Sequence, residues 1–110
     1  MFVTADDVLT YVGVKNPSQA DTDWAVKVAA AVEAGLTARL NGAVIIDPSP
    51  AFDELHLAAT FAAGEAYKRR EVPFGGTGFA DVEAANALAR DYLSAVTPQI
   101  DRYGNGPGIG

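Results

Sequence analysis

Apolar side chains recur every fourth residue through the first half of the chain. The positions are Trp24, Val28, Val32, Leu36 and Leu40. This interval places them on one face of a helix, whereas a strand would bring every second residue to the same face. The pattern therefore predicts a helix from about Asp23 to Leu40, with Asp21 or Thr22 as its N-cap and Asn41-Gly42 as its end.

A shorter helix is predicted before this one by its capping residues. Thr4 stands where an N-cap is expected, and Asp6 and Asp7 follow in the first turn, where the helix dipole favours acidic side chains. Apolar residues continue to Val12, and Gly13 is a suitable stop. We expect a helix over residues 5–12.

The strongest start signal in the chain is Ser49 followed by Pro50, an N-cap with proline in the first helical position. The helix that begins there is apolar over a wide arc, so we expect it at the centre of the fold. Gly64 lies inside it and costs about 1 kcal/mol relative to Ala. We therefore expect another element to pack closely against Gly64.

The second half of the chain predicts one more long helix, which starts near residues 79–81 and ends before Pro98. Ile100 and Tyr103 are expected in a last short turn. The only β-like run, residues 43–47, is too short for a sheet, and we interpret it as an extended segment that packs on the helices or pairs with another chain. The predicted fold is all-α: a four-helix domain over residues 1–103 and a flexible tail over 104–110, which has too few side chains to form a core.

Composition narrows the function more than it narrows the fold. The 110 residues suit one domain, and the absence of cysteine excludes disulfides and fits a cytosolic setting. A net charge of -6 argues against binding nucleic acid phosphates or an anionic membrane surface. No apolar run is long enough to cross a bilayer, and the N-terminus does not resemble a signal peptide.

Candidate chemistry is sparse. His56 is the only histidine, and Asp53 lies three residues away on the same helical face, but nothing in the spacing suggests a triad. Glu65 is expected to face solvent or to pair with Arg69 one turn later. The glycine-rich run at residues 74–78 lacks the residues of a phosphate-binding loop. We therefore expect no catalytic residue, no metal site and no cofactor.

The most informative polar cluster is Lys68-Arg69-Arg70 at the predicted end of the third helix. Cations at this end match the helix dipole, which is the simplest interpretation. The alternative is that the cluster binds carboxylates of a neighbouring copy of this acidic chain. A head-to-tail contact of that kind forms rings when its rotation closes.

The order of segments resembles that of the head-to-tail connector, or adaptor, proteins of tailed bacteriophages, the head-completion family. It comprises TADDVLTYVGV, DTDWAVKVAAAVEAGLTARL, VIIDPSP and PAFDELHLAATFAAGEAYKRRE, then a glycine-containing loop and a last helix that ends near IDRYG. The resemblance spans nearly the whole chain and implies a structural virion protein without enzymatic activity.

The resemblance also implies the partners. Members of this family form a homo-oligomeric ring of about a dozen copies, a dodecamer, beneath the portal protein. The ring lies in the neck of the virion after synthesis in the host cytoplasm, and it extends the channel through which DNA passes without specific binding. Its other side receives a tail-side neck protein or a tail terminator. No membrane is involved.

Carried over by position, the resemblance implies two contact regions. The loop over residues 72–79 would be an assembly surface with Phe74 as its anchor, next to Lys68, Arg69 and Arg70. The portal-contacting tail would comprise Tyr103, Gly104, Asn105, Gly106, Pro107, Gly108, Ile109 and Gly110. Because Ile109 is the only large aliphatic side chain of this tail, main-chain contacts would dominate its binding.

Three other functions are compatible with the sequence. The first is a helical DNA-binding regulator, although the loop between the first two predicted helices is longer than a helix-turn-helix allows and the second helix has few cations. The second is a small helical enzyme subunit or ligand carrier, which a retained metabolite would reveal. The third is another ring protein of the neck, such as a tail-completion protein.

The interpretation of the basic cluster predicts a separation of folding from assembly. Replacing Arg69 and Arg70 together by Glu should leave the protein helical by circular dichroism, because both lie at or beyond the end of a helix. The same variant should fail to join heads to tails, because it would repel a neighbour's carboxylates. Normal virion assembly by this variant would refute the interpretation.

Overall fold

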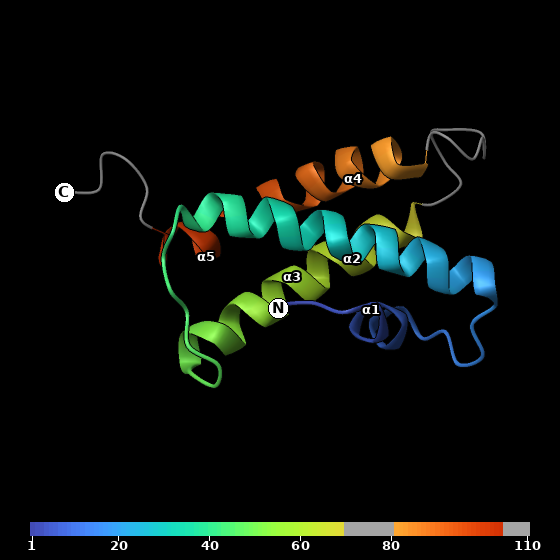
Figure 1. Cartoon of the computed structure of the whole chain (residues 1–110), viewed down its shortest axis with the longest axis horizontal. Coiled ribbons are helices and arrows are strands. Elements are labelled where there is room, and N and C mark those ends of the chain that lie inside the picture. The colour runs from blue at the N-terminus through green and yellow to red at the C-terminus, as the bar shows by residue number, and fades with distance from the viewer. Residues whose placement is uncertain (70–80, 105–110) are drawn as a thin grey trace.

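The structure, a computed structural model, describes residues 1–69 and 81–104, and this part of the chain forms five helices and no strand (Figure 1). The helices are α1 (Ala5–Val12), α2 (Gln19–Leu40), α3 (Pro50–Lys68), α4 (Asp81–Ala95) and α5 (Thr97–Asp101). The predicted all-α fold is confirmed, and α1 has the predicted bounds.

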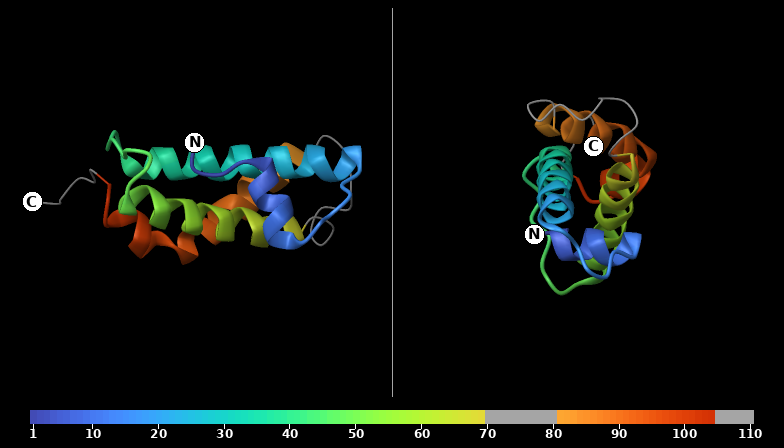
Figure 2. Two further views of the ribbon diagram at one scale, coloured as in Figure 1. Left: turned by 90° about the horizontal axis from the view of Figure 1, so that it is seen from below. Right: turned by 90° about the vertical axis from the view of Figure 1, so that its right-hand side faces the viewer.

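α2 and α3 run antiparallel along the molecule (Figure 1), and each contacts all the other helices. α4 covers one side of this pair and α1 crosses the opposite side, as the right-hand view of Figure 2 shows. α3 thus lies at the centre as expected, and α2 shares that position. The largest fully buried side chains come from all five helices and the N-terminal segment; they include Leu36, Leu55, Leu93, Ile100 and Val3.

The start of α2 differs from the prediction. The helix begins at Gln19, one turn before Asp23, because Ser18 is its N-cap. The Ser18 hydroxyl accepts a hydrogen bond from the backbone N–H of Asp21, and the Asp21 carboxylate accepts one from the backbone N–H of Ser18. This reciprocal capping box satisfies donors that would otherwise lack a partner at a helix start.

The start of α3 matches the prediction. The Ser49 hydroxyl accepts a hydrogen bond from the Phe52 N–H, and Pro50 lies in the first turn, where its missing N–H costs nothing. The helix ends at Lys68, and Arg69 is its C-cap. The first two cations of the basic cluster therefore close the helix, as the sequence suggests.

The close approach predicted at Gly64 is confirmed, and the element that packs there is α1. A Cβ atom added at Gly64 would collide with the aromatic ring of Tyr11. Glycine therefore lets the end of α1 lie directly on the backbone of α3, which no larger residue would allow without a shift of the ring.

The β-like run at residues 43–47 is an extended segment and not a strand. Ala43 and Ile45 pack against the core, whereas Val44 is 86% exposed and Ile46 is 69% exposed. Ala43 and Ile45 therefore fit the first predicted arrangement, in which the segment packs on the helices. The outward residues lie open to solvent.

The predicted last turn of the chain is α5. It contains Ile100, which is fully buried and fixes this helix to the core, whereas Tyr103 lies just beyond its end. Pro98 follows α4 as expected and lies in the first turn of α5. Residues 70–80, which include Arg70 and Phe74 of the predicted loop, and residues 105–110 lie outside the described part of the chain.

The packing at Gly64 predicts a specific loss of stability. Gly64→Ala should lower the free energy of unfolding by about 1 to 2 kcal/mol, because overpacking against the Tyr11 ring outweighs the helix propensity of Ala. Thermal denaturation measures this. With Tyr11→Ala in place, Gly64→Ala should become neutral or stabilising; equal losses in both backgrounds would contradict the packing.

Candidate functional site

The basic end of α3 is bound within its own subunit. The Lys68 ammonium lies 2.9 Å from the Glu65 carboxylate, to which the Tyr11 hydroxyl also donates a hydrogen bond of 2.9 Å. The same ammonium lies 5.3 Å from the centre of the Tyr11 ring. Glu65 was expected to face solvent or to pair with Arg69. Its ion pair is with Lys68, three residues later, and the charge of Arg69 contributes to lowering its pKa.

Arg69 ties the end of α3 to α4. Its guanidinium lies 5.9 Å from the centre of the Tyr92 ring, a cation–π distance. Lys68 and Arg69 therefore each have a partner in the fold, and both side chains also reach solvent. Arg70 and Phe74, the other two residues of the predicted assembly surface, lie outside residues 1–69 and 81–104.

The contacts of Glu65 shift three pKa values. The hydrogen bond from Lys68, followed by that from Tyr11, lowers the pKa of Glu65 below its ordinary value. The hydrogen bond to Glu65 in turn raises the pKa of Lys68 and that of Tyr11. This end of the molecule therefore keeps one carboxylate and one ammonium charged over a wider pH range than free side chains would.

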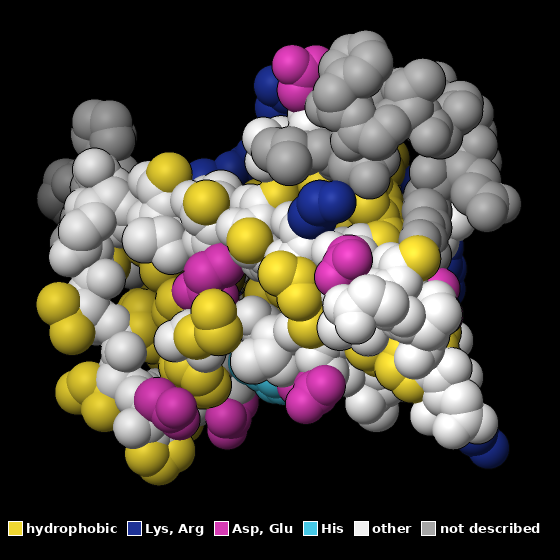
Figure 3. All heavy atoms as spheres, turned by 45° about the vertical axis from the view of Figure 1, so that its right-hand side comes forward, with side chains coloured by type: hydrophobic (Ala, Val, Ile, Leu, Met, Phe, Trp, Pro, Cys, Tyr) yellow, Lys and Arg dark blue, Asp and Glu magenta, His cyan; other side chains and the backbone are white. Residues whose placement is uncertain are grey.

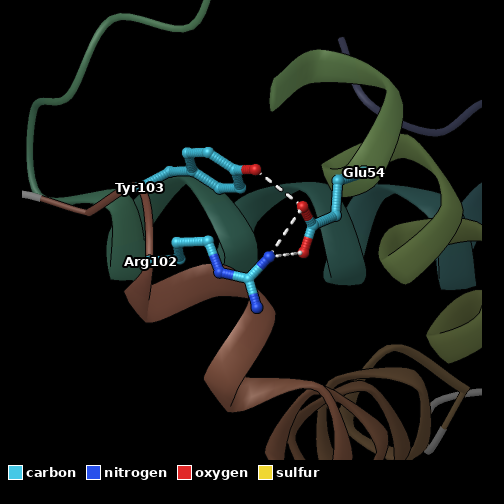
Figure 4. Close-up of polar contacts among 3 residues, drawn as sticks. All are labelled: Glu54, Arg102 and Tyr103. Atoms are coloured by element: carbon cyan, nitrogen blue, oxygen red, sulfur yellow. Dashed lines mark hydrogen bonds and ion pairs between the residues drawn. The ribbon is translucent and has the colours of Figure 1, made fainter. Parts of the chain in front are cut away.

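A second polar cluster holds the chain where the predicted tail begins (Figure 4). Arg102 donates from Nη1 to both oxygens of Glu54, at 3.1 and 2.8 Å, and the Tyr103 hydroxyl donates to the same carboxylate at 2.6 Å. The bond to Glu54 raises the pKa of Tyr103. Gly104 lies against the end of α2, where an added Cβ would be 3.0 Å from the Arg39 carbonyl oxygen. The first two residues of the predicted tail thus lie on the helical body.

His56 and Trp24 have structural contacts. His56 Nδ1 lies 2.7 Å from the Phe2 carbonyl oxygen, and its ring stacks on Phe52, so it holds the N-terminal segment instead of pairing with Asp53. The Trp24 indole is buried as predicted and donates to the Tyr67 carbonyl. Within the two described ranges no three His, Asp or Glu side chains gather as a metal site would require.

The feature that sequence reasoning missed is apolar surface on the outer sides of α2 and α3. We call the exposed residues of α2 between Asp23 and Asn41 the α2 face; they are Val26, Ala30, Ala34, Thr37 and Ala38. We call Leu57 and Phe61 the α3 face; they are 69% and 38% exposed. Figure 3 views the molecule from the side of α2 and shows hydrophobic side chains open to solvent over much of its left half; the outer side of α3 faces away in this view.

The sequence did contain a signal for these faces. Leu57 and Phe61 form an apolar row on a side of α3 different from that of the buried Ala59 and Ala62, as the spacing already indicates. A helix with apolar residues all round is expected to be covered on every side. The periodicity alone does not reveal whether the second row meets another helix of the same subunit or lies outside.

The two ends of the molecule also differ. Segment 43–47, with Val44 and Ile46 exposed, and Gly104 lie at one end of the elongated body (Figure 1). The last residues of α3 and the first of α4, which flank residues 70–80, lie at the other end. Residues predicted to contact different partners are therefore attached at opposite ends.

Comparisons of the chain with protein-family models, with curated proteins and with solved structures find no significant match. Among the helices that the structure describes, none has the length and apolar character needed to span a bilayer.

The lowered pKa of Glu65 predicts a pH-dependent contribution to stability. Because this pKa is lower in the folded state than in the unfolded chain, the charged carboxylate stabilises the fold at neutral pH, and this contribution is lost as pH falls through the folded pKa. Thermal melting should therefore show wild type and Glu65→Gln converging between about pH 5 and pH 3.

Tyr11→Phe is the matched control for that experiment, because it keeps the ring against Gly64 and removes one donor to Glu65. It should weaken the pH dependence in part and leave the bond from Lys68. A constant difference between wild type and Glu65→Gln at every pH would contradict the assigned contacts.

Proposed function

We propose that this chain is a head-to-tail adaptor of a tailed bacteriophage, a structural subunit of the virion neck that performs no reaction. The observation that carries the proposal is the distribution of exposed apolar residues. They occur at one end, at Val44 and Ile46, and along two sides, at Val26 and Leu57. Contiguous exposed apolar surface marks sites of protein contact. A small helical body with such surface on several sides suits a subunit that has neighbours in a ring and above or below it.

Different segments are attached at the two ends of the molecule, which supports contacts with two different partners. In the proposed arrangement, the end with segment 43–47 and Gly104 meets the portal protein, and residues 105–110 extend this contact. The opposite end, where Arg69 caps α3 and α4 begins, carries the loop with Arg70 and Phe74 toward a tail-side neck protein or tail terminator. Next to it in the sequence, Lys68 is paired with Glu65 and the Arg69 guanidinium lies over the Tyr92 ring.

Charge supports a conduit through which DNA passes without binding. The net charge of -6 repels phosphate weakly, which favours transit over retention. α2 carries two cations, Lys27 and Arg39, and both are partly buried, so α2 is poorly suited to enter a DNA groove as a recognition helix. These two observations favour the adaptor over the helical DNA-binding regulator.

A nonsense mutation in the gene, in the phage that encodes it, tests the proposed function. Restrictive infection should yield DNA-packaged heads and separate tails by electron microscopy, because the junction between them is missing. Supplying the wild-type chain from a plasmid should restore infectious particles, and the chain should then be found in purified virions by mass spectrometry. Complete infectious particles that lack the chain would overturn the proposal.

A further inference from the structure

The α2 face and the α3 face lie on opposite sides of the subunit, because α2 and α3 form its two lateral walls, between α4 above and α1 below in the right-hand view of Figure 2. Each face is directed away from the core that both helices share. A surface on one side and a complementary surface on the other allow identical subunits to join in sequence, which closes into a ring when the rotation permits.

The outer surface of α4 shows what a solvent-facing helix of this chain looks like. From Glu83 onward, where the exposure of α4 is described, its exposed residues other than Ala95 are polar or charged; they are Glu83, Asn86, Arg90, Asp91 and Ser94. Between Val26 and Ala38 the exposed residues of α2 are apolar or threonine. The charged residues of this stretch, Lys27 and Glu33, are only partly exposed, whereas Asp23, one turn earlier, is exposed. Two helices of the same small domain thus differ in the outer surface that they present, and the difference indicates that the α2 face is covered in the assembled state.

We infer that the α2 face of one copy binds the α3 face of a second copy of this chain. This contact rests on the proposed ring and specifies how neighbouring subunits meet. The α2 face is shallow because it consists mainly of alanine and threonine, whereas the α3 face projects Leu57 and Phe61. Helices pack when large side chains on one helix fit between small side chains on the other.

The register of the contact follows from the level of residues within one subunit. Trp24 donates a hydrogen bond to the carbonyl of Tyr67, so these two residues lie at about the same height on the antiparallel helices. The helices are antiparallel, so moving six residues along α2 and six back along α3 brings Ala30 level with Phe61. Ten residues in the same way bring Ala34 level with Leu57. In a closed ring whose axis is parallel to these helices, neighbours are not displaced along the axis. The same pairs then meet between subunits.

This register places each large residue of the α3 face opposite an alanine of the α2 face. It also places the exposed carboxylate of Asp23 beside the exposed ammonium of Lys68, at one edge of the contact. Within the chain, Asp23 accepts a hydrogen bond from Gln19, and Lys68 is paired with Glu65. In the proposed contact, Asp23 and Lys68 would become additional partners of each other. Apolar and charged positions thus match in one arrangement, which favours a second copy as the occupant.

Disulfide cross-linking tests the contact, because the chain has no cysteine of its own. Ala34→Cys/Leu57→Cys carries one thiol on each face, and the two lie on opposite sides of one subunit, so they can bond only between copies. Oxidation of the purified protein at high concentration should give a ladder of multimers on a non-reducing gel. Ala30→Cys/Phe61→Cys should give the same ladder.

The matched control is Ala30→Cys/Asp53→Cys, which uses the same two faces out of register. Its thiols differ in height by about 12 Å, beyond the reach of a disulfide. It should give no ladder. Circular dichroism checks that every variant remains helical, and single-cysteine variants should stop at dimers. An equal ladder from the control, or none from either in-register pair, would overturn the contact.

A charge exchange tests the edge of the contact independently. Asp23→Lys should slow ladder formation by Ala34→Cys/Leu57→Cys about two- to fivefold at low salt, and adding Lys68→Glu should restore it. No rescue by the second substitution would reject the pairing of these residues. If the cysteine variants form a ladder but the chain is absent from virions, the adaptor function is overturned and the contact is supported. If the chain is present in the virion neck but no ladder forms, the contact is overturned and the adaptor function is supported.

Discussion

The structure depends on the pairing of two long helices, α2 and α3. Together they carry more apolar surface than this small domain can bury. The inner sides of α2 and α3 are buried against each other and against α1, α4 and α5. Their outer sides still carry Val26, Leu57 and Phe61 in contact with water. The free energy that would be gained by covering these residues favours association, and the function proposed for the chain uses that tendency.

The pairing of α2 with α3 also sets the geometry of everything attached to them. Many of the buried residues of α3 are alanines, so neighbouring helices approach closely, and Gly64 allows α1 to lie on its backbone. The bond from the Trp24 indole to the Tyr67 carbonyl holds the two helices in one register. The pair therefore separates the end with segment 43–47 from the end with Arg69, which is compatible with the proposed contacts at two ends.

Local signals in the sequence predicted most of the fold. Ser49-Pro50 marked the start of α3, and Gly64 predicted a close neighbour, because capping and glycine tolerance are decided by adjacent backbone atoms. The predicted start of α2 was one turn too late because Asp21 is not the N-cap but the N3 partner of Ser18 in a capping box. The partner of Glu65 was missed in part because Tyr11 is 54 residues away and no spacing rule connects them.

The candidate contact surfaces could be predicted only partly, for a physical reason. The apolar row of Leu57 and Phe61 is visible in the spacing, but periodicity does not say whether a row meets the same chain or another one. The anchoring of Tyr103 on Glu54 depends on the three-dimensional path of α5, which brings residues 49 positions apart together. Only the three-dimensional structure therefore distinguishes the apolar surfaces that stay exposed in the single chain from those buried in its core.

A reconstruction of the intact neck of the virion that encodes this chain tests the central claim most directly, because it shows both the position of the chain and its contacts. The account predicts a closed ring of copies between portal and tail, with Leu57 of each copy against the alanines of α2 in the next. A neck built without this chain would contradict the account, as would a ring in which α2 and α3 both face solvent on their outer sides.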